Sequence, residues 1–537
     1  MVQLISRLKN RYSTLNSMMM KYYSKLKIFF SVILILLAYK TKQDFLLLFI
    51  SLSELILIWE LTNFIFAKNI KVANFLNSIL VLLFNIQQVS IIFGGTFISL
   101  IMLSNIDSIE ALKGKILIYL SLIIPMICLS ILSVGVLNSE LFIKYRNLHL
   151  VFITLSGLFI IPNRLNSSIF NYYVLYQEKM EQVEMLNNIQ KNSSSKIEFL
   201  KETIDDGIRK PQTIPENSNV IIIFTEGLSQ SIIDDNRNFM PNLQKFQSES
   251  IVFDNYFNHT FATYAGLSGQ LYSGYQYSNY DKNTLVSIES VLESRGYSTQ
   301  FLNTEPNNPE FTQYLKNFNY DNVIGEKNED TLTDKEAYDL LFNHMEEMEK
   351  NNEPFFTTIY TFGTHVSLDS NDEKYADGTN RMLNKFYNLD VQFGNFLEKF
   401  KNSELYENTI LIFTSDHATY VDEDYLNTFG NNRLVGNLDK IPFYIYHKGI
   451  DPTRIDALGR NSLDLVPTIL DYLDIEASNY FLGESLFTDK FSDFDTVFFS
   501  EMSLLSTKDG KIQFLNDEDK THLLGILEKY FSAKLSE

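Results

Sequence analysis

Five side chains that could do chemistry stand near the ends of apolar segments in the second half of the chain: Glu226, Thr263, His365, Asp416 and His417. Carboxylate oxygens and imidazole nitrogens are ligands that suit Zn²⁺ or Mn²⁺. A threonine hydroxyl is a poor nucleophile until a metal or a base lowers its pKa, and a carboxylate and histidine site would supply that activation. Together these residues are typical of a site for nucleophilic phosphoryl transfer.

Strands are expected directly before most of these residues. The run NVIIIFTEG predicts a strand buried on both faces, with Glu226 just beyond its carboxyl end. TIYTFG precedes His365 in the same way, and TILIFT precedes Asp416 and His417. Because ligands collect at the carboxyl ends of strands in open α/β sheets, the sequence predicts a metal site of Glu226, Asp416 and His417 with an open position for substrate.

Thr263 stands at the expected start of a helix over ATYAGLSGQLYSGY, whose small residues allow close packing. Exposed amides and the helix dipole favour an anion such as phosphate at this place. Taken alone, a threonine here is also a common helix cap, and an Asp-His pair is common in loops. The order of the acid, the threonine, the histidine and the Asp-His pair along the chain favours the joint catalytic interpretation.

Strands alternate with helical patterns from Asn219 onward, which predicts an α/β domain with a largely parallel sheet. Further strands are expected at 298–302, 354–362, 409–414 and 441–447. Helices are expected at 335–350, 383–401 and 462–473.

Charge divides the chain into two parts of different character. The formal net charge is -20, yet basic residues outnumber acidic ones before Phe170, so the negative charge belongs to the remainder. An acidic domain repels nucleic acid, which argues against that class of partner. The single cysteine, Cys128, excludes a disulfide within the chain and a zinc site built from several cysteines.

Five apolar blocks separated by short charged breaks precede Arg164: 28–39, 45–67, 72–106, 116–139 and 147–163. Roughly 20 residues are needed to span the hydrocarbon core of a bilayer, and the short first block spans only if the lysines at its ends snorkel. The sequence therefore predicts a five-span transmembrane domain over 1–165, a helical linker over 166–217 and a catalytic domain over 218–537.

Lysines and arginines cluster before the first block and after the second and fourth, which predicts that those segments are cytoplasmic. Five spans would then place the catalytic domain on the extracellular side of the cell membrane. Glu54 and Glu60 lie within the second block, where a charge is costly. A role near a lipid headgroup and a plain packing or interfacial role are both open for them.

With these segments in place, the sequence resembles the sulfatase-like branch of the alkaline phosphatase superfamily, and in particular its membrane-anchored lipoteichoic acid synthases, phosphoglycerol transferases and lipid A phosphoethanolamine transferases. The matching segments are NVIIIFTEG, MPNLQKF, the Thr263 helix, TFGTH, NTILIFTSDH, KIPFYIY and SLDLVPTILDYL followed by GESLF. The resemblance implies an alkaline phosphatase-like fold and one divalent metal ion, Mn²⁺, Zn²⁺ or Mg²⁺, on Glu226, Thr263, Asp416 and His417. It also implies Thr263 as the nucleophile and His365 as a substrate-binding residue.

The chain departs from its relatives at three places. Because no C/S-x-P-x-R motif is present, sulfate ester hydrolysis is not expected. The disulfides usual in phosphoethanolamine transferases of Gram-negative envelopes are also missing. The stretch FLNTEPNNPEF lacks the His, Trp and Arg with which lipoteichoic acid synthases grip glycerol phosphate, which leaves the headgroup open.

The expected reaction transfers a phospholipid headgroup phosphate through a phosphothreonine to a cell-envelope glycopolymer or glycolipid. Glycerol phosphate from phosphatidylglycerol is the first headgroup to consider. A phosphoethanolamine transferase and a phosphodiesterase that uses water are the alternatives, and a catalytically inactive membrane scaffold is a rival from another class.

Overall fold

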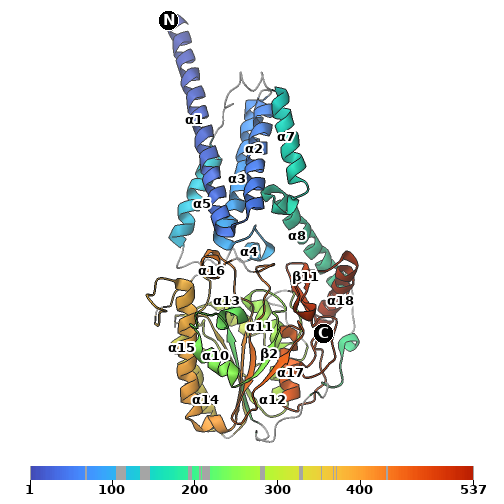
Figure 1. The fold of residues 1–537 in the computed structure, drawn as a ribbon. Helices are drawn as coiled ribbons and strands as arrows, with labels where there is room; N and C mark the ends of the chain where they lie inside the picture. The colour runs from blue at the N-terminus through green and yellow to red at the C-terminus, as the bar shows by residue number, and fades with distance from the viewer. Residues whose placement is uncertain are drawn as a thin grey trace. The chain divides into compact units, whose positions relative to one another are not determined.

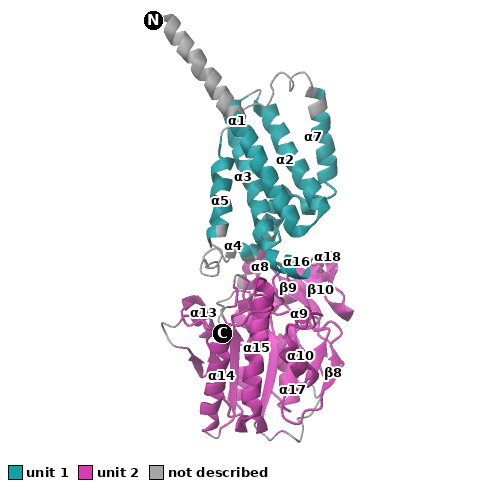
Figure 2. Cartoon of the chain, turned by 60° about the vertical axis from the view of Figure 1, so that its left-hand side comes forward, with its two compact units in different colours: residues 1–181, 421–431 teal, residues 182–420, 432–537 magenta. Residues whose placement is uncertain are grey.

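The computed structural model describes residues 2–66, 69–104, 116–132, 146–191, 196–204, 207, 214, 218–277, 285–325, 330–351, 353–366, 368–370, 372–430 and 433–535. The chain divides into two compact units, which Figure 2 colours separately: 1–181 with 421–431, and 182–420 with 432–537. The division into 1–165, 166–217 and 218–537 expected from the sequence stays a prediction. Within the expected linker, 192–195, 205–206, 208–213 and 215–217 lie outside the described residues.

The first unit is built from helices (Figure 1). They are α1 Val2–Lys42, α2 Phe45–Phe66, α3 Ile70–Gly94, α4 Leu100–Ser104, α5 Ile116–Ser130, α7 Arg146–Ile160, the turn η2 Arg164–Asn166, the start of α8 Ser168–Lys191, and α16 Glu423–Phe429. Three stretches are long and apolar enough to cross a membrane: Tyr22–Lys42, Phe45–Phe66 and Ile70–Gly94. The five-span count stays a prediction, because 105–115 and 133–145 lie outside the described residues.

A carboxylate in the second apolar helix has backbone partners. Glu54, which is 3% exposed, accepts hydrogen bonds from the backbone N–H of Ser168 at 2.8 Å and of Ile169 at 3.2 Å. The hydroxyl of Ser167 also donates to it. Since the first N–H groups of a helix have no partner within the helix, Glu54 caps the start of α8. This is a packing role, one of the two that the sequence left open.

The second unit contains an eight-stranded sheet in the order β4-β3-β5-β1-β6-β7-β2-β8. The strands are β1 Asn219–Thr225, β2 Ile251–Asp254, β3 Ser298–Leu302, β4 Asn322–Ile324, β5 Phe355–Thr361, β6 Thr409–Ser415, β7 Phe443–Tyr446 and β8 Thr453–Asp456. Five adjacent strands, from β4 to β6, are parallel, and β7 runs antiparallel to both of its neighbours. The predicted α/β fold with a mostly parallel sheet is confirmed.

Helices cover both faces of this sheet. On one face, alternate residues of β1 (Val220, Ile222 and Phe224) share a buried core with α11, α12, α13 and α17. On the other face, Phe246 of α10 packs 5.0 Å from Phe393 of α15, which packs 5.1 Å from Phe413 of β6. The bounds are α9 Gln230–Ile233, α10 Pro241–Ser248, α11 Thr263–Leu271, α12 Ile288–Glu293, α13 Pro309–Leu315, α14 Asp334–Glu349, α15 Arg381–Lys401, η4 Glu404–Glu407, η5 Ser462–Asp464 and α17 Leu465–Tyr472.

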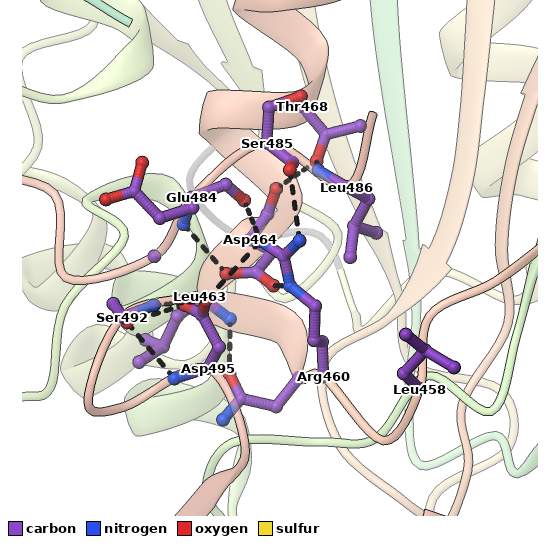
Figure 3. A network of polar contacts seen from close by, with 12 residues as sticks. Leu458, Arg460, Leu463, Asp464, Thr468, Glu484, Ser485, Leu486, Ser492 and Asp495 are labelled. Atoms are coloured by element: carbon purple, nitrogen blue, oxygen red, sulfur yellow. Dashed lines mark hydrogen bonds and ion pairs between the residues drawn. The ribbon is translucent and has the colours of Figure 1, made fainter. Parts of the chain in front are cut away.

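A buried arginine ties the C-terminal segments to this core (Figure 3). The Nε of Arg460 donates to Asp464 at 2.7 Å, and its Nη2 lies 3.5 Å from Asp495. Arg460 also donates to the carbonyl of Glu484 at 2.8 Å. The remaining elements are η3 Lys196–Phe199, β9 Val497–Ser500, β10 Ser503–Ser506, η6 Lys508–Gly510, β11 Gln513–Phe514 and α18 Asp517–Leu535.

Glu289 on α12 makes the stability of this unit depend on pH. Its carboxylate is fully buried, and its Oε2 has no hydrogen-bond partner. Burial raises the pKa of Glu289 from 4.5 to about 7. Since only the folded state then keeps the proton between these values, stability falls as pH rises from about 4.5 to about 7. We expect Glu289→Gln to remove about 3 kcal/mol of this loss, measured as unfolding free energy at pH 5 and pH 8.

Glu293→Gln is the matched control, because Glu293 ends the same helix and is exposed. It should leave the difference between pH 5 and pH 8 as in the unaltered protein. An equal pH dependence in Glu289→Gln and the unaltered protein would show that Glu289 is ionised in the folded state.

Candidate active site

The carboxyl ends of three parallel strands lie level at one edge of the sheet. Thr225 of β1 pairs with Thr361 of β5 on one side and with Ser415 of β6 on the other. The next backbone groups continue this contact, because Glu226 N–H donates to the Thr361 carbonyl and Asp416 N–H to the Thr225 carbonyl. The residues that follow β1, β5 and β6 are therefore held side by side.

Glu226, Asp416 and His417 form a buried cluster at this edge. Each offers a ligand atom within 4.8 Å of the others. His417 Nε2 lies 3.5 Å from Glu226 Oε1 and 3.4 Å from Asp416 Oδ2. The sequence placed these three residues together, and the structure brings them together.

The hydrogen bonds around the cluster leave its inner atoms available for a cation. Asp416 Oδ1 accepts from the N–H groups of Gly227 and His417, whereas Oδ2 is buried without a hydrogen-bond partner. His417 Nδ1 lies 2.8 Å from the Ala418 carbonyl and donates to it, so Nε2 is the nitrogen that faces the two carboxylates. Two carboxylates and an imidazole are a donor set for a divalent metal ion, and the residues present fit such an ion.

The pKa values in the cluster diverge. Burial and the charge of Glu226 raise the pKa of Asp416 to about 7, against the opposing effect of His417. Burial alone would raise the pKa of Glu226, but His417, His365 and the Tyr360 hydroxyl together lower it. The two buried carboxylates repel each other when both are ionised. A cation bound between them would stabilise the ionised form of both.

Thr263 is the first residue of α11 and reaches the cluster. Its Oγ1 donates to Glu226 Oε2 at 3.0 Å, and its side chain is half-buried, so solvent reaches it. A Cβ on Gly266 would lie 2.4 Å from the Asp416 carbonyl oxygen, so the absence of a side chain there lets α11 approach this segment. Ala262, the preceding residue, has φ 78° and ψ 144°, a backbone conformation found almost only in glycine.

His365 follows β5 and lies beside the cluster without belonging to it. Its ring stacks on Phe362, with centroids 4.7 Å apart, and Lys385 Nζ donates to its backbone carbonyl at 3.3 Å. The residue before it, Thr364, donates its hydroxyl to the Glu226 carbonyl, which holds this segment beside the cluster. The roles expected for His365 and Thr263 stay predictions.

Tyr360 was missed by reasoning from the sequence. Its hydroxyl donates to Glu226 Oε2, the oxygen that also accepts from Thr263. The residue is 1% exposed and lies one position before the end of β5. Its place in an apolar strand looks like that of any core aromatic, so only the position near the strand end could have drawn attention to it.

Residues 218–475 match the protein-family model described as Sulfatase. This part of the chain is a sulfatase-family domain. The match covers the whole candidate site, from the strand before Glu226 to the helix after Asp464. The three long apolar helices of the first unit also identify the chain as a membrane protein.

Two curated proteins are similar to this chain in sequence. Lipoteichoic acid synthase 2 of Bacillus subtilis is 24% identical over 310 residues, covering 50% of this chain and 47% of its own length. Phosphoglycerol transferase I of Escherichia fergusonii is 23% identical over 315 residues, covering 51% of this chain and 39% of its own. The match thus spans about half the length, or less, of these curated relatives.

Two solved structures share the fold. An alkaline phosphatase superfamily protein of Vibrio parahaemolyticus has a TM-score of 0.50 at 18% identity, covering 65% of this chain and 93% of its own. The integral membrane protein lipooligosaccharide phosphoethanolamine transferase A of Neisseria meningitidis has a TM-score of 0.50 at 13% identity, covering 84% and 95%. At these identities the likeness shows the fold alone. The alkaline phosphatase-like fold expected from the sequence is confirmed.

Proposed function

We propose that the chain is a metal-dependent phosphotransferase. It moves the headgroup phosphate of a membrane phospholipid, through a phosphothreonine at Thr263, to a hydroxyl of a cell-envelope glycopolymer or glycolipid. The observation that carries this proposal is the hydrogen bond from the half-buried Thr263 hydroxyl to Glu226, within a cluster that fits a divalent metal ion. The names of two curated relatives favour a phosphoglycerol headgroup, for which we propose phosphatidylglycerol as the donor. The name of one solved structure gives phosphoethanolamine as the alternative.

The first step forms a bond between Thr263 Oγ1 and phosphorus and breaks the bond between phosphorus and the diacylglycerol oxygen. Glu226 Oε2 accepts the hydrogen bond of the Thr263 hydroxyl, so it lies where the departing proton goes. A divalent ion on Glu226, Asp416, His417 and Thr263 would lower the pKa of the hydroxyl and balance negative charge on the phosphate. Diacylglycerol leaves with a proton on its oxygen.

The second step reverses the roles of the two oxygens. An acceptor hydroxyl forms a bond to phosphorus, the bond to Thr263 Oγ1 breaks, and Thr263 regains its proton. His365, beside Glu226, binds the phosphate or exchanges a proton with the leaving group. Water in place of the acceptor would give hydrolysis, which is the phosphodiesterase alternative.

Placement at the membrane belongs to the same proposal. We propose five spans within residues 1–165, a linker over 166–217 and a catalytic part over 218–537 on the extracellular side of the cell membrane. The basic residues before the first apolar block support this orientation. A site attached to membrane helices stays close to a donor that cannot leave the bilayer.

The proposal is tested with the purified full-length protein and labelled lipids in mixed micelles. With Mn²⁺ present, diacylglycerol should appear from phosphatidylglycerol or from phosphatidylethanolamine, and a metal chelator should stop its release. A label found on an added glycolipid identifies transfer, whereas a free headgroup phosphate identifies hydrolysis. Absence of diacylglycerol from both lipids would exclude a lipid donor.

A further inference from the structure

One buried carboxylate beside the candidate site does not belong to the metal cluster. Glu305 follows β3, which pairs in parallel with β5, so it lies at the same edge of the sheet. Its side chain is 8% exposed. Burial, with a smaller effect of the Glu226 charge, raises the pKa of Glu305 to about 7. Its carboxylate is not among the ligand atoms that group together at the metal site.

The described surroundings of Glu305 supply no positive charge. Asn308 Nδ2 donates to Glu305 Oε2 at 3.1 Å, and the same asparagine caps α13 with its Oδ1. Among the residues that the structure describes, no lysine, arginine or histidine forms an ion pair with Glu305. A buried carboxylate without a cation is costly, and the cost is removed when a cation binds beside it.

A row of aromatic rings connects α13 to Tyr264, the neighbour of the proposed nucleophile Thr263. Tyr264, the neighbour of Thr263, stacks on Tyr314 at 4.5 Å and on Phe311 at 5.7 Å, both from α13. Phe311 lies 5.5 Å from Tyr360, whose hydroxyl bonds Glu226. Tyr264 is partly exposed, as Thr263 is. Aromatic faces attract alkylammonium groups, and more strongly where water is excluded.

Thr304, the residue before Glu305, is hydrogen-bonded to β5. Its hydroxyl donates to the Tyr360 carbonyl at 2.6 Å, so the residue before Glu305 is bonded to the strand that carries Tyr360. The charge of Glu305 also acts on the Tyr360 hydroxyl, as the charges of Glu226 and Asp416 do. Glu305 is therefore held beside the strand of Tyr360, at the same edge of the sheet as the cluster.

We infer that Glu305, with the Tyr264 ring, forms a subsite for an alkylammonium group on the transferred headgroup, as in ethanolamine. The inference rests on the proposed function and selects between its two headgroups. Glycerol offers hydroxyls, which can hydrogen-bond a carboxylate but cannot balance its charge. The residues of this chain thus favour phosphatidylethanolamine, although its curated relatives are named for lipoteichoic acid and phosphoglycerol.

The test compares diacylglycerol release by the full-length protein from phosphatidylethanolamine and phosphatidylglycerol. The unaltered protein should prefer phosphatidylethanolamine by at least about tenfold in kcat/KM, the discrimination that a desolvated cation contact provides. Glu305→Gln, which keeps the shape and removes the charge, should lose that preference, because kcat/KM should fall about tenfold more on phosphatidylethanolamine than on phosphatidylglycerol. Glu310→Gln is the matched control, because Glu310 lies in the first turn of α13 and is exposed.

Other outcomes separate this inference from the proposed function. Preference of the unaltered protein for phosphatidylglycerol overturns the ammonium subsite and leaves headgroup transfer intact. An equal loss on both lipids in Glu305→Gln assigns Glu305 a structural role and also overturns it. If neither lipid releases diacylglycerol, the proposed function fails. Calorimetric titration with free phosphoethanolamine and glycerol phosphate then still tests Glu305, and tighter binding of glycerol phosphate overturns the subsite.

Discussion

Thr263→Ala should lower headgroup transfer by at least about a thousandfold, equivalent to about 4 kcal/mol of transition-state stabilisation. The substitution removes the only atom proposed to bond the phosphorus, while the buried metal cluster keeps its two carboxylates and its imidazole. Diacylglycerol release from labelled lipid measures the loss. Protein quenched during turnover should carry phosphothreonine at Thr263, which mass spectrometry of the intact chain and its peptides detects.

Thr263→Ser and Ser268→Ala serve as controls for this experiment. Serine keeps a hydroxyl at the start of α11, so part of the activity and the phosphorylated residue should persist. Ser268 lies on the same helix and its hydroxyl donates to the Tyr264 carbonyl, not to the metal cluster, so its loss should leave the rate within a few-fold. Unchanged activity of Thr263→Ala would rule out the threonine nucleophile, and an unaltered protein that never transfers a headgroup would support the inactive scaffold.

Glu226→Gln should weaken the binding of Mn²⁺ by about a hundredfold or more. The change removes a negative charge from a buried set of three ligands, and even residues that only orient a ligand are worth about 10- to 100-fold in affinity. Calorimetric titration of the metal-free full-length protein measures the affinity. The rise in melting temperature on adding Mn²⁺ should shrink in parallel, because the ion stabilises only the state that binds it.

Tyr360→Phe provides the graded comparison. It removes the hydrogen bond to Glu226 Oε2 but no ligand charge, so the loss of affinity should fall between those of the unaltered protein and Glu226→Gln. Glu310→Gln, at an exposed position, should bind Mn²⁺ as the unaltered protein does. Equal metal affinity in Glu226→Gln and the unaltered protein would show that the cluster is not the metal site.

The parts of the fold that sequence predicts well are those in which burial dictates the residue pattern. β1 and β6 contain apolar runs, and β5 a run of aromatic and β-branched residues, because both faces of a central parallel strand are covered. The bounds of β3 were predicted correctly. The direction of β7 was not predicted, since antiparallel pairing with β6 and β2 depends on partners distant in sequence. The number of membrane spans likewise does not follow from amino-acid composition alone.

The residues of the candidate site also fall into those that the sequence predicts and those that it does not. Strand ends are local features, and the parallel sheet then brings Glu226, Asp416 and His417 to one edge without further information. Tyr360 and Glu305 could not be found, because one looks like a core aromatic and the other stands in a polar loop. Only the tertiary contacts show that both carry charge or hydrogen bonds beside Glu226.

The cap that Glu54 provides for α8 has a consequence for biosynthesis. Its partner Ser167 is 113 residues later in the chain, so α2 leaves the ribosome long before the groups that bond its carboxylate exist. Insertion of an unpaired acidic residue at the centre of a membrane helix costs about 2.5 to 3.5 kcal/mol. Pairing of the Glu54 carboxylate is therefore a late event of translation, because residues 167–169 can dock only after the chain has passed the apolar helices between them.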